Sequence, residues 1–181
     1  MAIKVAFIGA GSVGFARSLT LDLLTVPELQ DTHFAFHDID KGNLERVAQL
    51  CRKDLEANKL PARLTTTLQR KRALEGANYV INCTRIGGLE AFRTDIDIPL
   101  KYGIDQCVGD TLCAGGIMYG QRNIPQILAF QRDMKNVAGT DCLFLNYANP
   151  MAMNTWAALD AHDCGEGLDT VGLCHGVEGG W

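Results

Sequence analysis

The chain has 181 residues, of which 47% are hydrophobic, and its formal net charge is −4 at pH 7. Such a chain can form one domain with a sizeable core, and its slightly acidic charge argues against nucleic acid or an anionic membrane surface as the main partner. It contains no recognisable signal peptide, no apolar run long enough to cross a bilayer, and seven cysteines without C-x-x-C spacing, which argues against a disulfide framework and favours a reducing cytoplasm.

The first predicted element is an apolar strand over residues 3–8 that runs directly into Gly9-Ala10-Gly11-Ser12-Val13-Gly14. A strand, a G-x-G-x-x-G turn and a helix in this order are typical of a dinucleotide-binding βαβ unit. We expect Gly9 to permit the tight turn, Gly11 to let the backbone approach a pyrophosphate, and Gly14 to let the helix pack closely on the strand. The amide groups at the helix start would then bind the phosphates. An empty structural turn is the alternative.

A second strand is predicted over residues 33–37, and Asp38 follows its end. A carboxylate at this distance from the glycines accepts hydrogen bonds from the ribose hydroxyls and would repel a 2′-phosphate. Asp38 therefore favours NAD over NADP as the cofactor.

The middle of the chain continues the alternation of strands and helices. We expect a helix over 41–58 with Asp40 as its N-cap, a strand over 63–68, a short helix over 70–74 and a strand over 79–83. The fold class is therefore α/β, with a doubly wound, mostly parallel, six-stranded sheet and helices on both faces. Ligands bind such sheets beyond the carboxyl ends of the strands, near the switch point between the first and fourth. Cys83 and Thr84 are thus candidate cofactor-binding residues, while Gly87 and Gly88 could border the cofactor or form a plain turn.

A helix is predicted over 90–102, and the segment 108–122 is too rich in glycine to be a regular element. Such a long loop is usually functional or mobile, so its fixed charges, Asp110 and Arg122, are candidates for substrate contact or for surface solvation. A helix over 124–137 and a strand over 142–146 follow. Asn149 comes just before Pro150, which we expect in the first turn of a helix over 151–161. Asn149 could cap that helix or present its amide to a hydroxyl-bearing ligand.

The last predicted strand covers 170–174, and His175 follows it. Cysteine beside histidine is commonly a coincidence, although one of the pair could reach a metal, because adjacent residues on an extended chain point to opposite sides.

Five motifs together resemble family 4 of the glycoside hydrolases, most closely its α-galactosidase branch. They are Gly9-x-Gly11-x-x-Gly14, Asp110-Thr111 ahead of Gly115-Gly116-Ile117-Met118, Arg122-x-Ile124-Pro125, the run from Asn146 to Trp156, and Gly172-Leu173-Cys174-His175-Gly176. The family is an NAD-dependent exception to the usual two-carboxylate mechanism. Its dinucleotide domain is shared with lactate and malate dehydrogenases.

The resemblance implies that bound NAD⁺ takes hydride from C3 of an α-glycoside, which makes the C2 proton acidic enough for a base to remove. Elimination at C1, addition of water and reduction of C3 by the same NADH complete the hydrolysis. A divalent metal, usually Mn²⁺, stabilises the charge at O2 and O3 as a Lewis acid.

By the same resemblance, Cys174 is the metal-binding cysteine, although a thiolate suits manganese less well than oxygen ligands do. His175 stands where some members carry an acidic proton donor, and Asp110 where relatives carry an acidic residue near the substrate. Asn149 would hydrogen-bond sugar hydroxyls, with Arg122 as a further substrate-binding candidate. The residues expected to hold NAD are Gly9, Gly11, Ser12, Val13, Gly14, Asp38, Cys83 and Thr84.

Members of this family are more than twice as long, and their second metal-binding histidine and proposed base lie beyond the position of Trp181. We therefore expect residues 1–181 to form the dinucleotide-binding domain, without the substrate domain, and to leave an apolar surface that favours homo-oligomers. A lactate- or malate-type dehydrogenase is the alternative, with Arg85, Arg93 and Arg122 as possible carboxylate-binding groups. A non-catalytic NAD-binding module is the third reading. The sequence does not distinguish galactosides, glucosides and uronides as substrates.

Overall fold

The computed structural model describes residues 3–106, 109–139 and 141–174, and it contains a six-stranded parallel sheet. Every strand pairs in parallel with its neighbour, in the order β3-β2-β1-β4-β5-β6. The strands are β1 (Lys4–Ile8), β2 (His33–His37), β3 (Arg63–Thr67), β4 (Tyr79–Asn82), β5 (Leu143–Asn146) and β6 (Thr170–Gly172). This is the doubly wound order of a dinucleotide-binding domain, and it confirms the predicted fold class.

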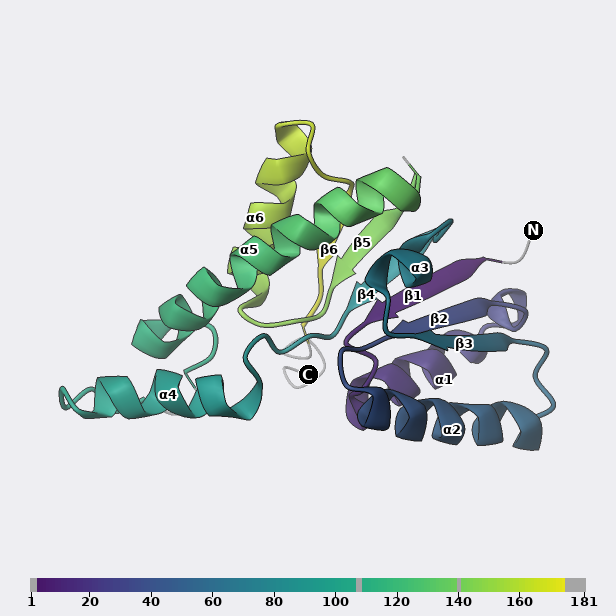
Figure 1. Cartoon of the computed structure of the whole chain (residues 1–181), viewed down its shortest axis with the longest axis horizontal. Coiled ribbons are helices and arrows are strands. Elements are labelled where there is room, and N and C mark those ends of the chain that lie inside the picture. Colours follow the sequence, from purple (N-terminus) through teal and green to yellow (C-terminus); the bar gives the residue numbers. More distant parts are fainter. Residues whose placement is uncertain (1–2, 107–108, 140, 175–181) are drawn as a thin grey trace.

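Helices cover both faces of the sheet, as predicted. They are α1 (Ser18–Leu24), α2 (Lys41–Ala57), α3 (Arg70–Leu74), α4 (Gly88–Leu100), α5 (Cys113–Val137) and α6 (Met151–Asp163), with a π-helical turn over Val13–Arg17 and a 3₁₀ turn over Pro27–Leu29. Figure 1 shows α1 and α2 against one face of the sheet and α3 and α5 against the other. In the described part of the chain, none of the helices is long and apolar enough to span a membrane.

The core follows from the period-two alternation of the strands. In β1, Val5 and Phe7 point into a cluster with α1 and α2, while Ala6 and Ile8 point into a cluster with α3, α5 and α6. Phe7 contacts Phe36 of β2 edge to face, with the ring centroids 5.2 Å apart. Because both faces of the strands are buried, the carboxyl ends are where polar side chains can gather.

The segment 108–122 differs from the expected loop, because α5 already begins at Cys113 and continues through Pro125 to Val137. Its glycines permit close approach between elements. A Cβ on Gly116 would lie 2.7 Å from the backbone carbon of Thr111, and a Cβ on Gly120 would lie 2.6 Å from Sδ of Met153 in α6. The glycine content therefore reflects tight packing of a helix.

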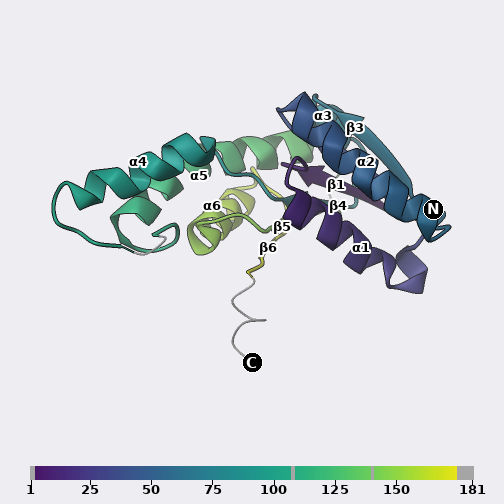
Figure 2. The same cartoon turned by 90° about the horizontal axis from the view of Figure 1, so that it is seen from below.

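The N-terminal half of α5 lies beyond the sheet and packs beside α4. These two helices therefore form an arm that projects away from the strands (Figures 1 and 2). Buried Asp95 of α4 binds Arg122 of α5 through two hydrogen bonds, of 2.6 and 3.1 Å. The ion pair explains how an acid is tolerated at 4% exposure.

Two local predictions were wrong. A Cβ on Gly14 would meet nothing within 4 Å, so Gly14 does not mediate the packing of helix on strand; buried Ala16 does so, because the chain here forms a wider π turn. Pro150 is the N-cap of α6 and not a residue of its first turn. The predicted N-cap Asp40 is confirmed by a 2.8 Å hydrogen bond from the Asn43 amide.

Candidate cofactor groove and its polar network

A groove with a volume of about 950 Å³ lies beyond the carboxyl ends of β1, β2, β4 and β5. It occupies the switch point of the sheet, where β1 lies between β2 and β4. Residues of the glycine turn and residues after each of these four strands line it. The lining includes Gly9, Gly11, Ser12, Phe15, His37, Asp38, Ile39, Asp40, Arg70, Cys83, Thr84, Arg85, Ile86, Gly87, Gly88, Tyr119, Tyr147 and Asn149.

Gly9 makes the sharp turn at the floor of the groove. Its φ is +87°, and a Cβ there would lie 2.9 Å from the backbone of Cys83 and Thr84. The amides of Gly9 and Ala10 donate hydrogen bonds to the carbonyl of His37, at 2.9 and 3.0 Å. The first glycine thus holds the tips of β1, β2 and β4 together, as its predicted role requires.

Asp38 is fixed by the glycine turn itself. The Gly11 amide donates to Oδ2 of Asp38 at 2.7 Å, and the Asp40 amide donates to Oδ1 at 2.9 Å. A Cβ on Gly11 would lie 2.7 Å from the same Oδ2. Gly11 is therefore needed for the approach of the turn to Asp38, a reason that adds to its expected contact with a pyrophosphate. The carboxylate borders the groove and retains lone pairs for a ribose.

His37 precedes Asp38 and also lines the groove. Its Nδ1 lies 3.2 Å from the carbonyl oxygen of Thr67 in β3. Burial lowers the pKa of His37 below the ordinary histidine value, and nearby Arg70 lowers it further, while the Thr67 contact and Asp38 oppose this. Near neutral pH the ring is therefore uncharged.

Two buried asparagines join the tips of β4 and β5. Nδ2 of Asn82 donates to Oδ1 of Asn146 at 2.9 Å, and Oδ1 of Asn82 accepts from the Thr84 hydroxyl at 2.8 Å. This network fixes the chain where Cys83 and Thr84 border the groove. Burial raises the pKa of the Cys83 thiol to about 12, so Cys83 contributes an uncharged surface there.

Asn149, Asp110 and Arg85 form a connected set at the β5 end of the groove. Nδ2 of Asn149 donates to Oδ2 of Asp110 at 2.9 Å, and a guanidinium nitrogen of Arg85 lies 3.7 Å from the same oxygen. The Arg85 guanidinium also lies over the rings of Phe92 and Tyr119, 4.7 and 5.4 Å from their centroids. Because one N–H of the Asn149 amide is bound to Asp110, Oδ1 and the second N–H are the groups that it can offer to a ligand.

Arg122 is held by its own neighbours. Besides the two bonds to Asp95, its Nε donates to the carbonyl of Ile86 at 3.0 Å, and its guanidinium lies 5.2 Å from the Tyr119 ring centroid. The hydrogen bonds to Asp95 raise the pKa of Arg122 further above its ordinary range. Arg122 thereby ties the loop after β4 to α4 and α5.

The structure brings most of the predicted site residues together. Gly9, Gly11, Ser12, Asp38, Cys83, Thr84 and Asn149 line the groove, and so do Gly87 and Gly88. Val13 and Gly14 are exposed and do not line it, while Asp110 and Arg122 lie behind Asn149 and Gly87. Cys174 is exposed just after β6, at the edge of the sheet where Asn149 also lies; His175 is outside the described residues.

Sequence reasoning missed several groove residues, among them Phe15, Ile39, Tyr119 and Tyr147. Ile39 carried a signal in the sequence, because it directly follows Asp38 beyond the end of a predicted strand. Phe15 and Tyr147 carried none, because they lie far apart in the sequence and meet only in the folded chain.

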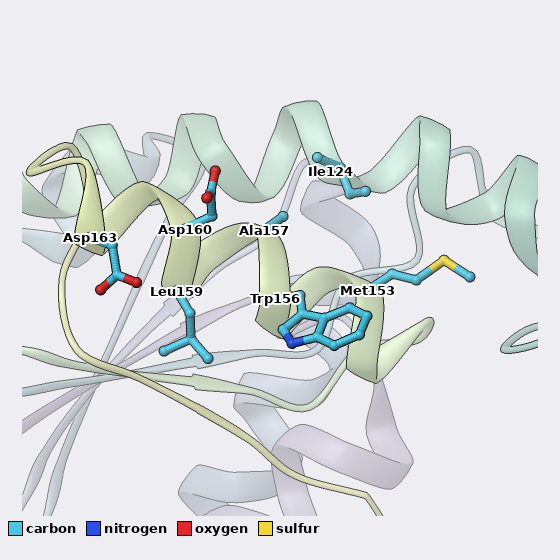
Figure 3. A pocket seen from close by; sticks show the side chains of 7 residues that line it. All are labelled: Ile124, Met153, Trp156, Ala157, Leu159, Asp160 and Asp163. Atoms are coloured by element: carbon cyan, nitrogen blue, oxygen red, sulfur yellow. The ribbon is translucent and has the colours of Figure 1, made fainter.

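A second hollow, of about 640 Å³, lies between α5 and α6 and is remote from the glycine turn (Figure 3). Ile124, Met153, Trp156, Ala157 and Leu159 give it an apolar wall, with Asp160 and Asp163 at one end. It has no glycine turn and no cation for a phosphate among the residues that line it. The groove at the switch point is therefore the candidate cofactor site.

Comparison with known proteins agrees with this geometry. The family profile of the family 4 glycosyl hydrolases matches residues 4–180. The chain belongs to family 4 of the glycosyl hydrolases. Over 177 residues it is 58% identical to the α-galactosidase of Rhizobium meliloti (strain 1021). The aligned region covers 98% of this chain and 35% of that protein. The family 4 chain thus spans about a third of the length of this curated relative.

Two solved structures place the family 4 chain among its structural neighbours. A 6-phospho-α-glucosidase from gut microorganisms, in complex with NAD and glucose-6-phosphate, has a TM-score of 0.80 and 26% identity, covering 96% of this chain and 38% of that one. Malate dehydrogenase from Salinibacter ruber has a TM-score of 0.57 and 18% identity, covering 88% of this chain and 41% of that one. The family 4 chain therefore shares its fold with a dehydrogenase, as predicted.

The described residues of the family 4 chain fit NAD better than they fit Mn²⁺. The groove supplies the glycine turn, with no room for a Cβ at Gly9 or Gly11, and the carboxylate that a dinucleotide needs. Among residues 3–106, 109–139 and 141–174, no three histidine, cysteine or acidic side chains gather as a metal site. The described residues therefore fit NAD, whereas for a metal they offer Cys174 alone among the expected ligands.

Proposed function

We propose that this chain is the NAD-binding part of an α-galactosidase that hydrolyses α-galactosides, or related α-glycosides, through oxidation at C3 of the sugar. The observation that carries the proposal is the groove in which Gly11 fixes Asp38 on one side while Asn149, held by Asp110, stands at the β5 end. The 58% identity to an α-galactosidase supports the choice of reaction, and the NAD-bound relative supports the choice of cofactor.

In this proposal the residues of the chain bind and orient. The Ser12 amide faces the pyrophosphate at the start of the helical segment, while the Gly11 amide holds Asp38, which accepts hydrogen bonds from the ribose hydroxyls. The bond from Nδ2 to Asp110 fixes the orientation of the Asn149 amide, which accepts a hydrogen bond from a sugar hydroxyl through Oδ1. When bound, NAD⁺ supplies the hydride acceptor.

A divalent metal, expected to be Mn²⁺, belongs to the proposal only through the family resemblance. Cys174 follows β6 at the edge of the sheet where Asn149 lies, because Leu173 donates to the carbonyl of Asn146 at 2.9 Å. Its exposure leaves it accessible to a metal. His175 lies outside the described residues, and its role as a proton donor stays a prediction.

The dehydrogenase alternative is less well supported. It needs arginines that can bind the carboxylate of a 2-keto acid, and each of the three candidates already pairs with an acidic side chain. Arg122 binds Asp95, Arg85 lies near Asp110, and Arg93 pairs with Asp97 on the exposed face of α4. The third reading, a non-catalytic NAD-binding module, predicts binding without turnover.

The test is the release of p-nitrophenol from its α-galactoside, with and without NAD⁺ and Mn²⁺, in all four combinations. It is run on the 181-residue chain and on the full product of the gene that encodes it. We expect the full gene product to release p-nitrophenol only when NAD⁺ and Mn²⁺ are both present, its Asn149→Ala variant to lose this release, and the 181-residue chain to bind NAD⁺ without release. Release by the full product that does not depend on NAD⁺ contradicts the proposal, and NAD⁺ binding without any release by the full product favours the non-catalytic module.

Sugar preference is tested in the same assay. The p-nitrophenyl α-galactoside, α-glucoside and α-galacturonide differ at C4 or C6, and the ratio of their kcat/KM values measures discrimination. The identity to an α-galactosidase favours the galactoside.

Self-association and location complete the proposal. Trp156 is 76% exposed in the hollow between α5 and α6, and such an apolar face supports the expected homo-oligomer. Sedimentation equilibrium of the chain and of Trp156→Lys tests this, with dissociation expected in the variant. The seven cysteines lack C-x-x-C spacing, which supports the cytoplasm as the proposed compartment.

A further inference from the structure

Phe15 and Tyr147 form an aromatic pair that lines the candidate cofactor groove. Their ring centroids lie 5.4 Å apart with an interplanar angle of 75°, an edge-to-face arrangement. Phe15 comes from the π turn after the glycines, and Tyr147 directly follows β5. Both side chains are half-buried and border the groove, so part of each ring is available to a ligand.

The position of the pair identifies the half of the cofactor that it would meet. A dinucleotide crosses the switch point of the sheet, with its pyrophosphate at the glycine turn. Asp38, after β2, marks the adenosine side of that turn. The other half must then extend toward the tips of β4 and β5, where Tyr147 and Asn149 border the groove. Phe15 and Tyr147 therefore lie on the nicotinamide side of the pyrophosphate.

The chemistry of the nicotinamide suits such a pair. The oxidised ring is planar and carries a positive charge, and the face of an aromatic side chain attracts a cation. In an edge-to-face pair the two rings are nearly perpendicular, so a planar ligand ring can stack on one of them while its own edge meets the face of the other. Reduction to NADH removes the charge and weakens the attraction.

We propose that Phe15 and Tyr147 form the wall of the nicotinamide pocket and bind the oxidised ring in preference to the reduced one. This inference rests on the proposed function, because it requires the groove to bind NAD. It adds two cofactor-binding residues and a preference for the oxidation state that begins the reaction. The rival explanation is that the pair only packs the π turn against the end of β5, since Tyr147 also contacts the core cluster of α1 and α2.

The test compares ligands that share the ADP-ribose moiety. Dissociation constants for NAD⁺, NADH and ADP-ribose are measured by calorimetry on the 181-residue chain and on Phe15→Leu, Tyr147→Leu and Tyr147→Phe. Leucine keeps an apolar side chain at each position, and Tyr147→Phe keeps the ring. Circular dichroism of each variant verifies that it is folded.

We expect each leucine variant to bind NAD⁺ about tenfold more weakly, NADH less affected, and ADP-ribose within about twofold of the wild-type chain. Tyr147→Phe should keep the affinity for NAD⁺. Ile39→Ala is the matched control, because Ile39 borders the groove beside Asp38; it should weaken NAD⁺ and ADP-ribose equally.

Several results would overturn the inference while leaving the cofactor proposal intact. One is an equal loss of NAD⁺ and ADP-ribose affinity in both leucine variants, which a packing role predicts. Others are unchanged NAD⁺ affinity in both variants, or a preference of the wild-type chain for NADH. If the wild-type chain binds neither NAD⁺ nor ADP-ribose, the proposed function fails together with this inference. If one leucine variant does not fold, the ligand affinities of the other leucine variant test the inference.

Discussion

Asn149 donates a hydrogen bond from Nδ2 to Oδ2 of Asp110 across 2.9 Å, and this bond joins the tip of β5 to the segment that precedes α5. The same carboxylate lies 3.7 Å from the Arg85 guanidinium. Asp110 thus holds the amide of Asn149 in one orientation, with Oδ1 free to accept from a hydroxyl. We infer that Asp110 positions Asn149, and the catalytic role predicted for Asp110 stays a prediction.

Replacing Asp110 by Ala should release the Asn149 amide. We expect the side-chain NH₂ resonances of Asn149 to exchange faster with water in an NMR spectrum, and the free energy of unfolding to fall by about 1 kcal/mol. Asp97→Ala, which removes an exposed acid from α4, is the control and should change neither quantity appreciably. Unchanged Asn149 resonances in Asp110→Ala would show that the bond does not orient the amide.

Gly11 and Gly14 form a matched pair of positions in one motif. A Cβ on Gly11 would lie 2.7 Å from Oδ2 of Asp38, whereas a Cβ on Gly14 would meet nothing within 4 Å. Gly11→Ala should weaken NAD⁺ binding by about tenfold or more. Gly14→Ala should leave it unchanged and raise the free energy of unfolding by about 0.5 kcal/mol. Calorimetry and urea unfolding measure the two effects, and equal NAD⁺ affinities in the two variants would contradict the geometry.

The ion pair of Asp95 and Arg122 anchors the arm formed by α4 and α5. The side chains are 5% and 27% exposed, so Asp95→Ala leaves a partly buried guanidinium without its partner. We expect the free energy of unfolding to fall by about 2 kcal/mol, less than for a fully buried pair because water reaches Arg122. The double variant Asp95→Leu with Arg122→Met should recover part of the loss. Urea unfolding measures both, and a loss of less than 0.5 kcal/mol, about that of an exposed pair, would contradict the anchoring role.

His37 should make the chain less stable in mild acid. Burial keeps its folded-state pKa below 6.5, so the unfolded chain binds more protons as the pH falls through the ordinary histidine range. The free energy of unfolding should therefore decrease as the pH falls below about 6.5. His37→Gln should show a shallower decrease. A pH dependence should remain in this variant, because burial also lowers the pKa of His33. Identical pH slopes for the wild-type chain and His37→Gln in urea unfolding would exclude this contribution.

The sequence predicted the sheet and the glycine turn because both depend on local pattern. Apolar runs such as 79–83, buried on both faces, indicate strands of a parallel sheet, and Asp38 is placed by the strand that it follows. Six strands, their parallel direction and the position of the groove could all be inferred in this way, and the structure confirms them.

Features that depend on contacts between distant elements could not be predicted. The glycines of α5 resembled a loop because their function is visible only against Thr111 and Met153. Arg122 looked available to a substrate because its partner, Asp95, lies 27 residues away on another helix. Phe15, in the π turn Val13–Arg17, meets Tyr147, which lies far away in the sequence after β5. In each case tertiary packing decided between alternatives that local pattern left open.

A crystal structure of the chain with NAD⁺ tests the central claim most directly. We predict that the adenine ribose hydroxyls lie on the Asp38 carboxylate, the pyrophosphate over the glycine turn at the Ser12 amide, and the nicotinamide beside Asn149. A dinucleotide bound in the reverse direction, or in the hollow between α5 and α6, would contradict the claim.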